Sequence, residues 1–199
     1  MRKPFEVYST LFILLVCTIS AQNQTNNPVD IIIGRDGIAL KGKFYISEGK
    51  DYLPTVILLN GFPGNENDVL GLGSSLSQSG FNTLTFNYSG TFQSQGTCSW
   101  DHAQLDIEAA FKFLFQPQNI KKYKIDTSSV FLGGWCFGGA MALPFASVHP
   151  EITSVFSIAG NDQGEWMREY MRNPEMKKTV DKMFDDLSVP KGHVRFEKK

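Results

Sequence analysis

Short apolar runs alternate with amphipathic stretches along this sequence, and the alternation restricts the possible folds more than any other feature. Each run has too few residues for a helix and lacks the polar alternation of a strand with one wet face, as is typical of strands buried on both faces. The runs are Thr55–Asn60, Phe81–Tyr88, Ser128–Cys136 and Ile152–Gly160. Helices are predicted between or beside them, over Asp68–Gln78, Trp100–Gln116 and Gly138–Val148. The sequence therefore predicts an α/β fold, with a mostly parallel central sheet and helices on both faces.

The segments on either side of this core have different patterns. The range Ile31–Ile46 contains two strand-like stretches around the turn Arg35-Asp36-Gly37, so we expect a hairpin. Beyond Gly164, two apolar stripes separated by Pro174 predict two amphipathic helices within residues 164–190. These helices could pack over one edge of the sheet or act as a lid over a substrate, and both interpretations are open.

Composition and charge limit the classes of partner. The 199 residues are 42% hydrophobic and 20% charged, which suits one globular domain with a buried core. The net charge is −1 and the lysines and arginines are scattered, so we expect no nucleic-acid partner. The three histidines lack ligand spacing, and no lysine follows the glycines of 133–139, so we expect no metal and no other cofactor. Nothing in the composition indicates an oligomeric state.

The first residues have the layout of a secretory signal peptide. Basic residues at positions 2 and 3 precede the apolar range Leu11–Ile19, and two small residues follow it. This run is shorter than the roughly 20 residues of a membrane-spanning helix, so we expect no stable membrane anchor. An uncleaved anchor is the alternative. The sequence predicts a signal peptide over 1–21, a linker over 22–30, and a secreted or periplasmic protein.

The pattern Gly-Gly-Trp-Cys-Phe-Gly-Gly at 133–139 lies between a predicted strand and a predicted helix. Gly134 and Gly138 flank Cys136 at minus two and plus two, where side chains would collide in the strained turn that exposes a nucleophile. The N-terminus of a helix also favours the negative, reactive form of a thiol. We interpret Cys136 as a nucleophile. A small apolar residue packed in the interior is the alternative.

Two backbone amides are predicted to complete the site. The N–H of Phe137, directly after the nucleophile, would point at the oxygen of a carbonyl under attack. The second donor would be the N–H of Phe62, in the glycine-rich loop Asn60–Asp68. Both loops follow strands that are expected to be neighbours, so the two amides would form an oxyanion hole.

Three segments of the sequence resemble the α/β-hydrolase superfamily, in its esterase and peptidase branch: LPTVILLNGFPGNEND, GFNTLTFNYSGTFQSQGT and GGWCFGGAMA. The resemblance covers Ile31 to Asn161. It implies that residues 31–199 form a hydrolase domain acting on ester, thioester or amide carbonyls of a small-molecule or peptide substrate. Asn60 stands where the family carries histidine, and Cys136 where it carries serine. Members similar to dienelactone hydrolase have a cysteine in the elbow, so a covalent thioester intermediate is implied.

The base and the acid of a hydrolytic triad are harder to assign. In the superfamily they follow the elbow in chain order, after two further strands. No comparable apolar run follows Ile152–Gly160, so we expect a sheet without the last two strands and a fragment of a longer hydrolase. The candidates are Asp162 as acid and His193 or His102 as base, each with an ordinary structural role as the alternative. A catalytically inactive fragment or pseudo-hydrolase that binds a ligand is the second functional hypothesis.

Two cysteines, Cys98 and Cys136, lie outside the predicted signal peptide. An oxidising compartment would allow them to pair, and a disulfide would block the nucleophile. We expect instead that Cys98 is a free, partly buried thiol.

Overall fold

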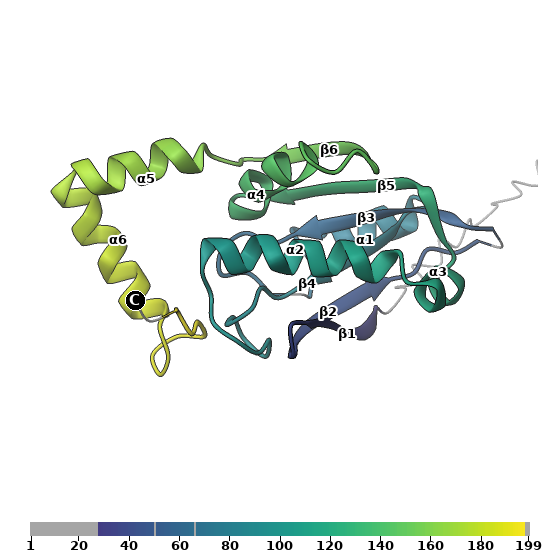
Figure 1. Cartoon of the computed structure of the whole chain (residues 1–199), viewed down its shortest axis with the longest axis horizontal. Helices are drawn as coiled ribbons and strands as arrows, with labels where there is room; N and C mark the ends of the chain where they lie inside the picture. The colour runs from purple at the N-terminus through teal and green to yellow at the C-terminus, as the bar shows by residue number, and fades with distance from the viewer. Residues whose placement is uncertain (1–27, 50, 66, 198–199) are drawn as a thin grey trace, which may run out of the picture.

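A six-stranded sheet forms the centre of the computed structural model, which describes residues 28–49, 51–65 and 67–197. Helices lie on both faces of this sheet (Figure 1). The predicted α/β fold with a mostly parallel sheet is therefore confirmed. The predicted signal peptide and most of the predicted linker fall outside the described residues.

The strand order is β1-β2-β4-β3-β5-β6. The strands span Val29–Arg35 (β1), Ile38–Tyr45 (β2), Leu53–Leu59 (β3), Asn82–Phe86 (β4), Ile125–Trp135 (β5) and Ile152–Ile158 (β6). β1 and β2 form the predicted hairpin and β2 pairs antiparallel with β4, whereas the pairs β4–β3, β3–β5 and β5–β6 are parallel. Leu59 lies opposite Gly134, so the loops after β3 and β5 begin at the same edge.

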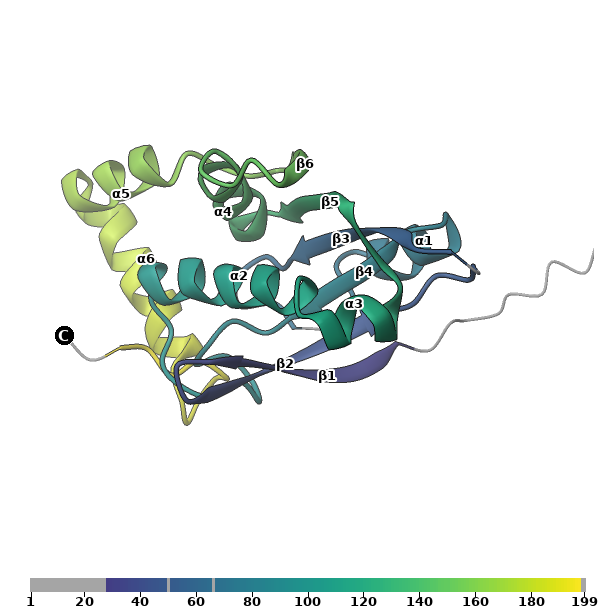
Figure 2. The ribbon, with the colours of Figure 1, turned by 45° about the vertical axis from the view of Figure 1, so that its right-hand side comes forward.

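The helices divide between the two faces of the sheet. They span Leu72–Gln78 (α1), Trp100–Leu114 (α2), Pro117–Tyr123 (α3), Phe137–Ala146 (α4), Gln163–Arg172 (α5) and Pro174–Leu187 (α6). α1 covers one face, and α2, α3 and α4 cover the other (Figure 2). Along β3, Val56 and Leu58 pack on the α1 side and Ile57 and Leu59 on the other side, as burial on both faces requires. No helix in the described ranges has the length and apolar content needed to cross a bilayer.

Two details differ from the sequence prediction. β1 begins at Val29, inside the predicted linker 22–30, because the first residues of β1 pair with the end of β2. The helix α3 has no counterpart in the prediction, since it is short and mostly polar. Its stability comes from tertiary packing, because the Tyr123 ring stacks on Phe44 with the centroids 4.2 Å apart.

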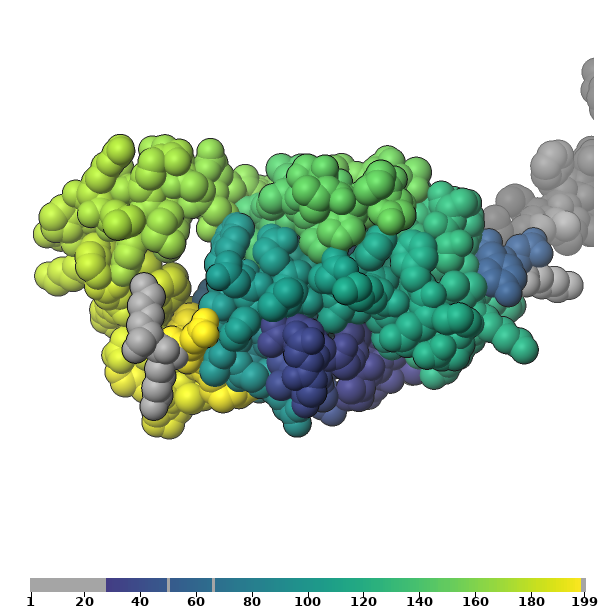
Figure 3. All heavy atoms as spheres, viewed as in Figure 1, coloured from purple at the N-terminus to yellow at the C-terminus, as the bar shows by residue number. Residues whose placement is uncertain are grey.

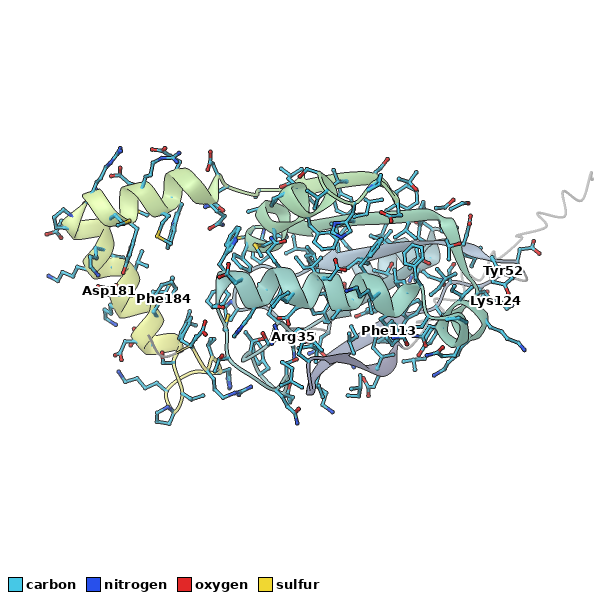
Figure 4. The ribbon with its side chains drawn as sticks, viewed as in Figure 1. Arg35, Tyr52, Phe113, Lys124, Asp181 and Phe184 are labelled. Atoms are coloured by element: carbon cyan, nitrogen blue, oxygen red, sulfur yellow. The ribbon has the colours of Figure 1, made fainter. Side chains whose placement is uncertain are left out.

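A buried ion pair joins β1 to α2. Arg35 Nη1 lies 3.1 Å from Asp106 Oδ1, and the Asp106 side chain is fully buried. The other carboxylate oxygen accepts from the Ser89 amide at 2.6 Å, so the pair also holds the loop that follows β4. Burial raises the pKa of Asp106, while the Ser89 hydrogen bonds and the Arg35 charge oppose that shift. Figure 4 shows Arg35 close to α2.

The last two helices stand beyond the carboxyl ends of the parallel strands. α5 and α6 pack against each other, and Figure 3 shows a hollow between them and the body of the domain. No residue of α5 is buried, and in α6 only Val180 is. Residues 188–197 then return to the loop after β4, where Arg195 N donates to Gly90 O at 2.7 Å. Residues 164–190 contain most of α5 and all of α6, and these helices lie beside the carboxyl edge of the sheet; the role of a lid stays a prediction.

Candidate active site

Cys136 occupies a sharp turn between β5 and α4. Its φ of 54° and ψ of −118° lie in a region that costs a non-glycine residue of order 1–3 kcal/mol. Cys136 N donates to Ile158 O at 2.8 Å, and Cys136 O accepts from Ala140 N at 3.0 Å. The neighbouring strand and the first turn of α4 therefore hold the turn in place. This is the strand-turn-helix arrangement that presents a nucleophile, and the cysteine is half-buried rather than sealed in the core.

The flanking glycines are required because the turn packs directly on the end of β3. A β-carbon on Gly138 would lie 2.6 Å from Asn60 O and would overlap Leu59 O. A β-carbon on Gly134 would lie 2.7 Å from Leu59 O. All of these separations are well below van der Waals contact. Only glycine at both positions lets the elbow approach β3 this closely.

The loop after β3 lies beside the nucleophile. A β-carbon on Gly61 would lie 3.4 Å from Cys136 Cβ. On its other side, Asn60 Nδ2 donates to Phe86 O at 2.9 Å, and Asn60 O accepts from the Tyr88 hydroxyl at 3.2 Å. The residue at the family's histidine position therefore ties the end of β3 to the end of β4.

The amides of Phe62 and Phe137 have no acceptor among the described residues. Phe137 is the first residue of α4, where a helix leaves its N–H groups unpaired. The two rings meet edge to face with their centroids 5.7 Å apart, so the residues are direct neighbours. Two unused donors beside a half-buried thiol are the components of an oxyanion hole. The structure thus brings Cys136, Phe62 and Phe137 together, and their catalytic roles stay predictions.

Two other candidate residues have structural partners of their own. The His102 ring lies near the start of α2, with Nδ1 2.8 Å from Thr97 O. Asp162 is exposed and caps α5, since its Oδ1 accepts from Glu165 N at 2.9 Å. Neither side chain hydrogen-bonds to Cys136 within the described ranges. The catalytic roles expected for both residues stay predictions.

The remaining histidines also lie apart from the thiol. His193 is exposed in the returning segment, and its ring stacks on Phe92 with centroids 5.1 Å apart. His149 lies at the far end of α4, where Nε2 is 2.8 Å from Glu108 Oε2. In the part of the chain that the structure describes, no histidine hydrogen-bonds to Cys136, and no three acidic, histidine or cysteine side chains could hold a metal ion.

Tyr88 is a supporting residue that sequence reasoning missed. It is buried directly beneath the elbow, with its ring edge-on to Phe137 at 5.4 Å. Burial, with the charge of Asp106, raises the pKa of Tyr88 well above its ordinary value, so the hydroxyl stays a neutral donor to Asn60 O. An isolated tyrosine at the end of an apolar run carries no sequence signal for this role.

The two thiols in the described ranges are both free but differ in environment. Cys98 is buried, and burial together with the charge of Asp106 raises the pKa of its thiol to about 12. The fraction of Cys98 present as the reactive thiolate is therefore negligible at neutral pH.

We expect Gly138→Ala to lower the free energy of unfolding by about 1–3 kcal/mol, because the new methyl group must displace the end of β3. Gly34→Ala is the matched control, since a β-carbon at Gly34 meets nothing within 4 Å. Urea unfolding followed by circular dichroism measures both. Equal losses in the two variants would contradict the packing described for the elbow.

We expect iodoacetamide at pH 8 to alkylate Cys136 in the folded protein and Cys98 only after unfolding. A raised pKa means less thiolate at a given pH, so folded Cys98 should stay unlabelled up to about pH 10, whereas an unfolded thiol ionises near pH 8.5. Peptide mass spectrometry with and without urea measures the labelling. Labelling of native Cys98 at the rate of Cys136 is the contrary result.

Comparison with known proteins identifies the fold family of the chain. Residues 54–188 match the model of the alpha/beta hydrolase fold family. No curated protein sequence matches the chain. Similar solved structures include hypothetical protein PA2218 from Pseudomonas aeruginosa, with 22% identity over 82% of this chain and 53% of that chain and a TM-score of 0.63. The α/β hydrolase GrgF from Penicillium sp. sh18 has 16% identity over 84% and 61% of the two chains and a TM-score of 0.60. Est1E from Butyrivibrio proteoclasticus has 16% identity over 63% and 49%, with a TM-score of 0.53.

At these identities the likeness to solved structures is one of fold. The chain spans about half to three-fifths of the length of these structures. The family model, by contrast, matches well over half of this chain, including all but the first residue of β3, the elbow and α6. The chain belongs to the alpha/beta hydrolase fold family.

Proposed function

We propose that this chain is an acyl hydrolase in which Cys136 attacks the carbonyl carbon of an ester, thioester or amide. The observation that carries the proposal is the strained, half-buried Cys136 with the unused amides of Phe62 and Phe137 beside it. Membership of the hydrolase family supports the reaction class, with a small molecule as substrate. A peptide is the other substrate class that we infer.

The first chemical step is the attack of the Cys136 thiolate on the carbonyl carbon. A C–S bond forms, and the carbonyl oxygen becomes an oxyanion that accepts from the N–H groups of Phe62 and Phe137. The unpaired amides at the start of α4 favour the negative charge on both sulfur and oxygen. Collapse of the tetrahedral intermediate breaks the bond to the leaving group, which takes a proton from water as it departs.

The second step returns the enzyme to its starting state. Water attacks the thioester carbon, the C–S bond breaks, and the sulfur leaves as the Cys136 thiolate. The carboxylic acid that forms gives its proton to the hydroxide left by the first step, so the cycle closes. A positioned general base accelerates such a step by about 10²- to 10⁴-fold. His102 and His193 are our candidates for this base, with Asp162 as the acid that orients it. Each would have to leave the contacts described above.

One observation favours a second function, a ligand-binding module with slow turnover. Within the described ranges no histidine hydrogen-bonds to Cys136, so water would attack the thioester without help. The acyl group would then stay on the sulfur. The two functions share the first step and differ in the fate of the thioester.

We expect wild-type protein to release p-nitrophenol from p-nitrophenyl acetate and Cys136→Ala to show only the background rate. Cys98→Ala, which removes the buried thiol, is the control that keeps the activity. Release beyond one equivalent per chain supports the hydrolase. One equivalent, with an acetyl group on the Cys136 peptide by mass spectrometry, supports the binding module. Equal rates for wild type and Cys136→Ala would exclude both.

We also infer that the protein is exported, on the strength of the apolar range Leu11–Ile19 behind two basic residues. Expressed in a host that secretes proteins, the chain should appear outside the cytoplasm with an N-terminus close to Gln22. N-terminal sequencing of the purified protein measures this. Recovery of a cytoplasmic chain that keeps its first 21 residues would overturn the inference.

A further inference from the structure

Five aromatic rings form a continuous row across the carboxyl edge of the sheet. The successive contacts, with the distances between ring centroids, are Trp100–Phe137 (5.8 Å), Phe137–Phe62 (5.7 Å), Phe62–Phe196 (6.1 Å) and Phe196–Phe184 (5.1 Å). The rings come from α2, α4, the loop after β3, the returning segment 188–197 and α6. We propose that this aromatic row binds an aryl group of the substrate, and that the site therefore prefers aryl-bearing substrates to small aliphatic ones.

The aromatic row keeps part of its surface free, unlike the core beneath it. Trp100 is 40% exposed, and the four phenylalanines are half-buried. Tyr88, which contacts Phe137 from below, is 1% exposed. Rings that only filled the interior would resemble Tyr88. Partly free aromatic faces and edges offer the large apolar contact that small-molecule sites use.

The aromatic row lies beside the proposed oxyanion hole, so this inference rests on the proposed function. Phe62 and Phe137 would each donate an amide to the substrate oxygen and also supply a ring to the row. A carbonyl held by both amides therefore places its substituents beside the row. Figure 4 shows Phe184 on α6, the helix that borders the hollow seen in Figure 3. The substrate group would enter from this hollow.

The returning segment holds Phe196 in place. Arg195 Nη1 donates to Phe92 O at 3.3 Å and Arg195 Nε donates to Gly96 O at 3.3 Å, and the guanidinium also bonds to Ser94 O. The backbone of the segment adds a bond from Cys98 N to Arg195 O at 2.7 Å. A ring that is fixed before binding loses little conformational entropy when a ligand packs on it. Phe196 is thus a specificity-determining residue that lies far from the elbow in sequence.

The test measures alkylation of Cys136 by N-benzylmaleimide and by N-methylmaleimide, so it does not depend on turnover. Each rate is divided by the rate of the same reagent with N-acetylcysteine, and labelling is read at the Cys136 peptide by mass spectrometry. We expect a normalised preference for the benzyl reagent of about three- to tenfold in wild type, as one aromatic contact supplies. Phe196→Ala should reduce this preference to about twofold or less.

Phe92→Ala is the matched control. It removes a ring of the same size that also touches the returning segment, through His193, but lies outside the row. This variant should keep the wild-type preference. If Phe196→Ala proves unfolded by circular dichroism, Phe196→Leu keeps an apolar anchor and should still lose most of the preference.

The outcomes separate the two proposals. A benzyl preference with no ester turnover would sustain the aryl site and remove the hydrolase. Turnover with equal normalised rates for the two maleimides in wild type would overturn the aryl site and leave the hydrolase standing. A folded Phe196→Leu variant with the full wild-type preference would show that the rings only pack on one another, and would overturn the inference as well.

Discussion

The close approach of the elbow to the end of β3 is the contact on which the site depends. Gly134 and Gly138 have no β-carbon, so the backbone of the turn can lie against the carbonyl groups of Leu59 and Asn60. This approach lets the strained Cys136 face the loop after β3. It also sets the distance between the amides of Phe62 and Phe137. A methyl group at either glycine would separate the two halves of the proposed oxyanion hole.

Polar contacts behind the elbow extend this constraint across the sheet. Asn60 Nδ2 donates to Phe86 O and the Tyr88 hydroxyl donates to Asn60 O, so two hydrogen bonds join the ends of β3 and β4. The loop after Tyr88 is in turn held by Asp106 of α2, which pairs with Arg35 at the end of β1. A buried carboxylate is expensive unless it is paired and hydrogen-bonded, and Asp106 satisfies both conditions. The loop that receives the returning segment is therefore held by hydrogen bonds beside the aromatic row.

The β6 edge of the sheet, on the opposite side from β1, is the more exposed edge. Within the described residues β6 has one neighbour, β5, and most of its residues are exposed. The sequence already indicated this strand as an edge, because no further apolar run follows it. β6 contains no charged residue and no proline, the residue types that usually protect the outer N–H and C=O groups of an edge strand. The helices α5 and α6 continue from this edge, and Phe184 and the returning segment connect them to the candidate site.

The sequence by itself determined the α/β class, the hairpin, the order of the main strands and helices, and the elbow around Cys136. These features follow from local causes, namely apolar runs of strand length and glycines at the positions where a side chain would collide. Tertiary structure alone decided the position of α3, the support of Asn60 by Tyr88, and the arrival of Phe196 beside Phe62. These contacts join residues far apart in the chain, and a single polar or aromatic residue carries no sequence signal of its partner.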